Sequence, residues 1–190
     1  MKMEWSSKHF FQNLVIYFKN TNMTNLKNLE NGDAIAKLKE LAKSAKTCMF
    51  CTDLKEQPIP SRPMALRDVD DEGNLWFISG MESIKNAEIL KDNMVQLFFS
   101  NTGSSEYLSI YGIAHIYNDR DTIEEKWSDM ANAWFEGKDD PQVSIIRVSP
   151  KETKYWDTED GKVITLLKLA TSTITGTKKD EGGVEGELNV

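Results

Sequence analysis

The chain has 190 residues, of which 39% are hydrophobic, and a formal net charge of -7. This length suits one compact domain that can bury its own core. The negative charge argues against nucleic acid or an anionic membrane surface as the main partner, so any phosphate must be held by local basic residues. The sequence has no run of about 18 apolar residues, so we expect no membrane-spanning helix.

The two ends of the chain are predicted to lie outside the main domain. Residues 14–18 are apolar, but Glu4 occurs early and no small-residue cleavage site follows, so we expect a cytoplasmic protein without a signal peptide. The polar C-terminal residues are predicted to be mobile, with an edge strand at 185–190 as the alternative. The expected divisions are an extension at 1–22, a folded domain at 23–170 and a polar tail at 171–190.

The predicted elements begin with a helix. Ile35, Leu38, Leu41, Ala42 and Ala45 repeat at helical spacing, after Asn31 or Asp33 as a start signal. Alternating or apolar runs then predict strands at 47–53, 61–68, 75–79, 95–100, 106–117, 143–148 and 153–156. Short turns between these strands favour a mainly β fold with flanking helices, an antiparallel barrel rather than a doubly wound sheet.

A second long helix is predicted after residue 120. Asp121 to Glu124 reads as a capping box, and the apolar side chains that follow repeat at helical spacing as far as Gly137. We expect this apolar stripe to pack in the core. Its members are Ile123, Trp127, Met130, Ala131, Trp134 and Phe135.

The strand 75–79 leads into a helix whose first turn carries Ser83 and Lys85. Because the first N–H groups of a helix already create a positive potential, a lysine there is best accommodated when an anion such as phosphate lies between them. The alternative is a capped surface helix with a solvated lysine. Upstream, Arg62 lies on an otherwise apolar strand, where it either extends from a sheet edge or points at a carboxylate or phosphate.

Together these motifs resemble the pyridoxamine 5'-phosphate oxidase-like family of FMN-binding split barrels, and more closely its general stress protein branch. The resemblance extends from Leu38 to about Trp156. It implies an antiparallel split β-barrel in which FMN contacts come from Arg62, Pro63, Met64, Ala65, Arg67, Ile78, Ser79, Ser83, Lys85, Tyr107 and Trp156.

Two positions depart from the oxidase pattern. Ile84 stands where the oxidases have an arginine, and Tyr107 stands where they have a glutamine that contacts FMN. The substrate-binding Arg-Leu-His-x-Arg tail of the oxidases also has no counterpart, so pyridoxamine 5'-phosphate oxidation is not expected.

The resemblance implies a homodimer with flavin sites at the interface. Tyr107 and Trp156 are the candidates for contributions from the second subunit, because both follow the phosphate-binding hairpin in the chain and are aromatic. The leading function is an FMN-dependent oxidoreductase that acts on a small substrate and accepts electrons from NAD(P)H or another donor. A non-catalytic protein that binds or buffers flavin is the alternative, and a deazaflavin-dependent reductase is the weaker one. No glycine-rich dinucleotide or P-loop motif is present.

The cysteines and histidines do not suggest a metal site. Cys48 and Cys51 have dithiol spacing, but residues three apart on a strand point to opposite faces, so we expect two buried, unpaired thiols in a reducing compartment. His9 and His115 are the only histidines, and we expect a structural role for His115.

Overall fold

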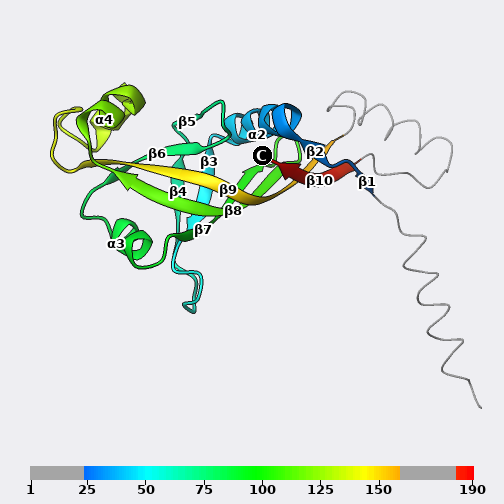
Figure 1. Cartoon of the computed structure of the whole chain (residues 1–190), viewed down its shortest axis with the longest axis horizontal. Helices are drawn as coiled ribbons and strands as arrows, with labels where there is room; N and C mark the ends of the chain where they lie inside the picture. The colour runs from blue at the N-terminus through cyan, green and yellow to red at the C-terminus, as the bar shows by residue number, and fades with distance from the viewer. Residues whose placement is uncertain (1–23, 159–182) are drawn as a thin grey trace, which may run out of the picture.

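The computed structural model describes residues 24–158 and 183–190. Within these residues, ten strands form one sheet that does not close, in the order β1-β10-β9-β8-β7-β3-β4, with β2, β5 and β6 attached beside it. The predicted split β-barrel with flanking helices is confirmed. In Figure 1, α3 and α4 lie toward one end of the long strands β8 and β9, and α2 lies nearer the other end.

The strands are β1 Thr24–Leu26, β2 Leu29–Glu30, β3 Thr47–Cys51, β4 Ser61–Ala65, β5 Asp68–Val69, β6 Leu75–Gly80, β7 Met94–Asn101, β8 Glu106–Tyr117, β9 Val143–Thr158 and β10 Gly183–Asn189. The helices are α2 Asn31–Ala45, α3 Ile84–Lys91, α4 Arg120–Lys126 and a 3-10 helix at Asp129–Ala133. None of these helices is long and apolar enough to cross a membrane.

The main core lies where α2 packs on the sheet. The predicted helical repeat is correct: Leu38, Leu41 and Ala42 are all buried. They join a cluster that includes Phe50 of β3 and Tyr155 of β9. This packing fixes one face of the sheet, so the side chains that alternate with it face outward.

Strand β9 is continuous, whereas the sequence predicted two strands in this region. The register of β8 against β9 shifts between Tyr111 and Gly112, so that Gly112 lies opposite Pro150 and the chain continues past the irregularity. A Cβ atom at Gly112 would lie 2.6 Å from the carbonyl oxygen of Ser149. A glycine is therefore required where the two strands approach at this bulge.

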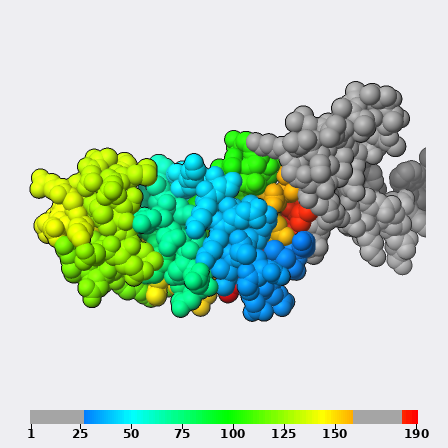
Figure 2. Space-filling model, turned by 90° about the horizontal axis from the view of Figure 1, so that it is seen from above, coloured from blue at the N-terminus to red at the C-terminus, as the bar shows by residue number. Residues whose placement is uncertain are grey.

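The predicted second long helix is wrong. Helix α4 has only seven residues, and its N-cap is Asp119, whose carboxylate accepts a hydrogen bond from the backbone N–H of Thr122 at 2.9 Å. The chain leaves the helix at Trp127, where ψ is 149°. Figure 2 shows α4 and the residues after it, in yellow-green, at the end of the molecule away from α2, in blue.

The apolar stripe of the predicted helix is divided between two environments. The rings of Trp127 and Phe135 lie with their centroids 6.5 Å apart and pack against a second small core around Trp76. Met130 and Trp134 instead stay 76% and 75% exposed. Because the helix ends before Trp127, the apolar side chains after it no longer share one helical face, and only some of them are buried.

The end of the predicted mobile tail is a strand. β10 pairs antiparallel with β9 on one side and parallel with β1 and β2 on the other, so it lies inside the sheet and not at its edge. A Cβ atom at Gly186 would lie 2.0 Å from the carbonyl oxygen of Lys27, which also accepts a hydrogen bond from the Tyr155 hydroxyl at 2.7 Å. The predicted extension at 1–22 and residues 171–182 of the predicted tail lie outside the described residues.

Candidate anion-binding site

Helix α3 begins directly after β6 and the turn that follows it. Ser83 is its N-cap residue, but the Ser83 side chain makes no capping hydrogen bond to the helix. Its hydroxyl oxygen lies 3.3 Å from that of Ser79 on β6. The first turn of α3 therefore has backbone N–H groups and a hydroxyl that a ligand could use.

A buried hydrogen-bond network anchors this end of α3. Asn86 accepts a hydrogen bond from the Ser79 hydroxyl at 2.8 Å and donates one to Ser144 Oγ at 2.9 Å. The Ser144 hydroxyl in turn donates to the backbone carbonyl of Ser79 at 3.0 Å. Since these three side chains are buried and partnered, the network holds the start of α3 rigidly against β6 and β9.

The guanidinium of Arg62 meets α3 from strand β4. Its Nη2 atom lies 2.7 Å from Glu88 Oε2, and its Nη1 atom donates to the hydroxyl of Thr52. Thr52 also donates to the same oxygen of Glu88. Arg62 therefore points at a carboxylate, as one reading of the sequence proposed, and has further N–H groups for a second acceptor.

Lys85 lies one helical turn before Glu88 and so on the same face of α3. Burial and the nearby charge of Arg62 lower the pKa of Lys85 below its ordinary value. Across residues 24–158 and 183–190, Lys85 forms no ion pair, whereas Arg62 pairs with Glu88. The group of Arg62, Lys85 and Glu88 carries one net positive charge, so it can bind an anion.

The loop between β3 and β4 is tied to the same helix. Lys91 Nζ lies 2.9 Å from Asp53, and Lys55 Nζ lies 2.8 Å from Asp92. These ion pairs join the loop to the C-terminal part of α3, while Thr52 joins it at Glu88. The loop and the helix therefore present Arg62 and Lys85 as one unit.

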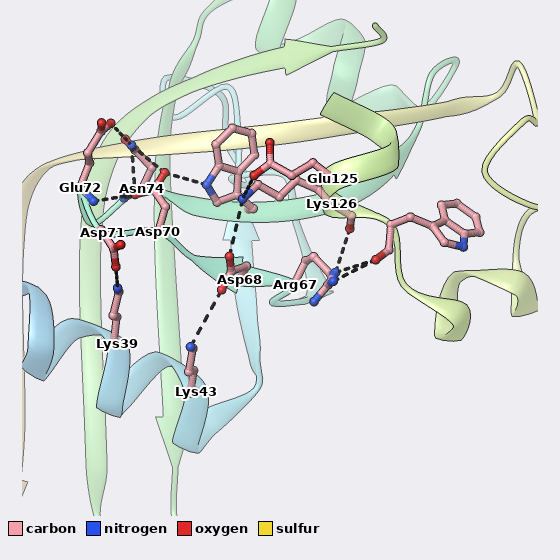
Figure 3. Close-up of polar contacts among 12 residues, drawn as sticks. Lys39, Lys43, Arg67, Asp68, Asp70, Asp71, Glu72, Asn74, Glu125 and Lys126 are labelled. Carbon is pink, nitrogen blue, oxygen red and sulfur yellow. Dashed lines mark hydrogen bonds and ion pairs between the residues drawn. The ribbon is translucent and has the colours of Figure 1, made fainter. Parts of the chain in front are cut away.

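Arg67 lies beside the end of α4, as Figure 3 shows, and so has a different environment from Arg62. Its Nε atom donates to the carbonyl oxygen of Lys126 at 2.8 Å, and its Nη2 atom donates to that of Trp127 at 2.9 Å. These carbonyls lie at the C-terminal end of α4, where unpaired carbonyl groups attract cations. Arg67 thus holds the segment after α4 onto the barrel.

Tyr107 and Trp156 lie directly opposite each other on β8 and β9 and are 42% and 38% exposed. Met49 and Phe98 lie opposite each other on the same outward face of the sheet, and both are also exposed. This face therefore has an exposed apolar surface formed by four side chains. No described contact joins it to Arg62 or Lys85 within one chain.

The remaining predicted flavin contacts lie on both sides of the sheet. Pro63 and Ala65 are exposed on β4, whereas Met64 between them is buried opposite Cys48. Ile78 on β6 is half-buried and packs against the second core cluster. The structure thus brings Arg62 of β4 close to Lys85 of α3, and separately brings Ser79 of β6 close to Ser83 at the start of α3.

Sequence reasoning did not find Thr52, Asn86, Glu88 or Ser144. Glu88 could have been found, because a residue three positions after Lys85 on a helix lies on the same face. Thr52 reaches Glu88 because the loop after β3 packs on α3, and Ser144 reaches Asn86 because β9 pairs with the distant strand β6. A single sequence carries no signal for either arrangement.

The thiols behave as predicted. Cys48 and Cys51 are both buried and free. Burial and the neighbouring Cys51 raise the pKa of Cys48 to about 12, so its thiol stays protonated at neutral pH. In the part of the chain that the structure describes, no group of three or more histidine, cysteine, aspartate or glutamate residues could hold a metal ion.

Comparison with known proteins identifies the class of this split barrel. The model of a family described as pyridoxamine 5'-phosphate oxidase like matches residues 33–180. The chain belongs to this family, and the resemblance seen in its motifs is confirmed.

Individual relatives agree with this assignment. Protein bli-3 of Neurospora crassa is 29% identical over 153 residues, which cover 75% of this chain and 73% of that protein. A solved structure assigned to general stress protein 26 of Jannaschia sp. CCS1 is 23% identical, with a TM-score of 0.69 over 84% of this chain and 99% of that one. The general stress FMN/FAD binding protein of Xanthomonas citri is 24% identical, with a TM-score of 0.56 over 65% of this chain and 87% of that one.

Proposed function

We propose that this protein binds FMN, with the flavin phosphate held by Lys85, Ser83 and the N–H groups at the start of α3, and with Arg62 beside them. The observation that carries this proposal is Lys85, a partly buried ammonium group next to a second cation and without an ion pair in the described residues. A phosphate would provide the counter-charge that this group lacks. Ser79 and Asn86 would keep the site in place.

FMN is favoured over FAD by the residues at hand. The site offers one cluster of cations and hydroxyls, and the sequence has no glycine-rich turn for a pyrophosphate. The Xanthomonas citri relative is described as an FMN/FAD binding protein, which makes FAD the natural competitor in a binding test. FMN, when bound, would supply the redox chemistry, so no side chain of this chain needs to act as an acid or base.

The first experiment is the absorbance spectrum of the purified protein, followed by titration of the apoprotein with FMN, FAD and riboflavin. We expect FMN to bind more tightly than riboflavin, because only FMN has the phosphate. Equal affinities for FMN and riboflavin would contradict the assigned phosphate site.

We further propose that this protein is an oxidoreductase whose bound flavin takes electrons from NAD(P)H and reduces a small acceptor. Anaerobic addition of NADH or NADPH should bleach the flavin absorbance at about 1 per second or faster. A flavin that stays oxidised with both donors would refute this part of the proposal and leave FMN binding intact.

A non-catalytic flavin-binding protein is the second candidate, and Arg67 is the observation that favours it. In an oxidoreductase, Arg67 would be free to attract an anionic substrate, but its guanidinium is bonded to the carbonyls of Lys126 and Trp127. Turnover of pyridoxamine 5'-phosphate should be negligible in either case.

The exposed apolar surface of Met49, Phe98, Tyr107 and Trp156 supports a homodimer with the flavin sites at its interface. Tyr107 and Trp156 would then reach the flavin bound by the other subunit. Light scattering over a dilution series, with and without FMN, tests this arrangement, because a ligand that touches both subunits stabilises the dimer. A monomer that still binds FMN tightly would refute it.

The two free cysteines favour the cytoplasm as the location of the protein, because thiols stay reduced there.

A further inference from the structure

Among the described residues, Glu88 is the one carboxylate that pairs with Arg62. Its side chain is 17% exposed and that of Arg62 is 24% exposed, so the pair is only weakly screened by water. The proposed function needs positive charge at this point, and Glu88 removes half of it.

The contacts of Glu88 are confined to one of its two carboxylate oxygens. Both Arg62 and Thr52 bond to Oε2, and no hydrogen bond to Oε1 occurs in the described residues. A single acceptor oxygen would therefore be enough to orient Arg62. The negative charge of the carboxylate goes beyond what this geometry requires.

The neighbouring cations are already paired with other carboxylates. Lys91 pairs with Asp53, and Lys55 pairs with Asp92, so neither offsets Glu88. Glu82, just before the N-cap residue, is exposed and is therefore screened by water. A phosphate bound at Lys85 would therefore be repelled by Glu88 at short range. This repulsion lowers the affinity of the site for phosphate without disturbing its shape.

We propose that Glu88 is a positioning residue that holds Arg62 and, by its charge, limits the affinity of the site for the phosphate of FMN. This inference rests on the proposed function. Its consequence is a flavin that exchanges with the solution pool instead of remaining permanently bound.

Glu88→Gln tests the inference directly. The Gln Oε1 atom can accept from both Arg62 and Thr52, and its amide group occupies the place of the oxygen without a partner, so the geometry is kept and only the charge is lost. We expect FMN to bind about tenfold more tightly to this variant at low salt, and riboflavin to bind as to the wild type. Added salt should reduce the gain, because screening weakens the repulsion.

Two matched variants separate charge from other effects. Glu88→Asp keeps the charge and should not tighten FMN binding. Asp71→Asn removes a fully exposed carboxylate on the turn before β6 and should leave FMN affinity within about twofold of the wild type. Circular dichroism and urea unfolding confirm that each variant is folded.

The inference is overturned if Glu88→Gln binds FMN no more tightly than the wild type, or if riboflavin gains as much as FMN. If the wild-type protein binds FMN well and the Glu88→Gln variant binds it with the same affinity, the role of Glu88 is refuted and the proposed FMN binding stands. A wild-type protein that binds no flavin removes the proposed function and this inference with it.

Discussion

Replacing Lys85 by methionine should have opposite effects on ligand binding and on stability. The ammonium group would contribute one charge-assisted contact to the phosphate, worth about 1.5 to 3 kcal/mol. At about 1.4 kcal/mol per factor of ten, Lys85→Met should weaken FMN binding by about 10- to 150-fold. The apoprotein should not lose stability, because the partly buried charge beside Arg62 disappears while the methylene groups are kept. We expect a gain of up to about 0.5 kcal/mol in the free energy of unfolding.

Fluorescence titration with FMN and urea unfolding of the apoprotein measure the two effects. Lys91→Met is the matched control, since Lys91 lies on the same helix and pairs with Asp53. Burial and Arg62 lower the pKa of Lys85, so Lys85 loses its proton at a lower pH than an ordinary lysine, and wild-type FMN affinity should fall as the pH rises toward 10.5. In Lys85→Met this fall should be absent. A variant that binds FMN as tightly as the wild type, or that unfolds at clearly lower urea, would refute the reasoning.

Three further outcomes follow from other contacts. Asp70→Asn should lower the free energy of unfolding by about 2 kcal/mol at neutral pH, because the carboxylate accepts hydrogen bonds from the backbone N–H of Asn74 and the indole of Trp76. Burial opposes ionisation, but these hydrogen bonds lower the pKa of Asp70, so the stability that the carboxylate contributes is complete above pH 3.8 and is lost as the pH falls through the lowered pKa. Urea unfolding between pH 2 and 7 tests this, and a variant whose stability falls with acid as much as that of the wild type would contradict it. The Cys48 thiol, with its pKa raised to about 12, should react with thiol reagents at pH 8 only after unfolding, and rapid labelling of the native protein would contradict this. Arg67→Met should increase hydrogen exchange in the segment after α4, and unchanged protection would mean that its hydrogen bonds to that segment matter little.

The regular elements could be predicted where local pattern and tertiary burial agree. Helix α2 and strand β8 follow their sequence periods because one face of each is buried in the core, with Leu38 and Leu41 on α2 and Leu108 and Ile110 on β8. Beyond residue 120 the same argument failed, because Met130 and Trp134 share the helical spacing of Trp127 but are exposed. Periodicity shows which side chains are apolar, but whether each one is buried depends on packing against strands that are distant in the sequence.

Strand β10 shows the opposite error. Val184 and Leu188 are buried and alternate with half-buried or exposed residues, which is the period of a strand. Glycine and glutamate around them made the segment resemble a solvated tail. The close approach of the Lys27 backbone leaves no room for a side chain at position 186. Gly186 therefore weakened the strand pattern in the sequence, although the sheet requires a glycine there.

The candidate site divides in a similar way. Ser83 and Lys85 could be identified from the electrostatics of a helix N-terminus, which depends only on local sequence. The pairing of Arg62 with Glu88 depends on how β4 packs beside α3, and no local pattern reports it. The sequence therefore indicated the cations of the site, and the structure added the acid that balances them.

The position of β10 also constrains the order in which the protein can assemble. β1 and β2 precede almost all of the described chain, but their neighbour in the sheet is synthesised last among the described strands. Until residues 183–189 are available, β9 has a free edge and the early strands have no partner, which invites chaperones or other chains to pair there. Bringing such distant segments together carries a large loop-closure entropy, so this junction should form late and govern the slowest phase of refolding.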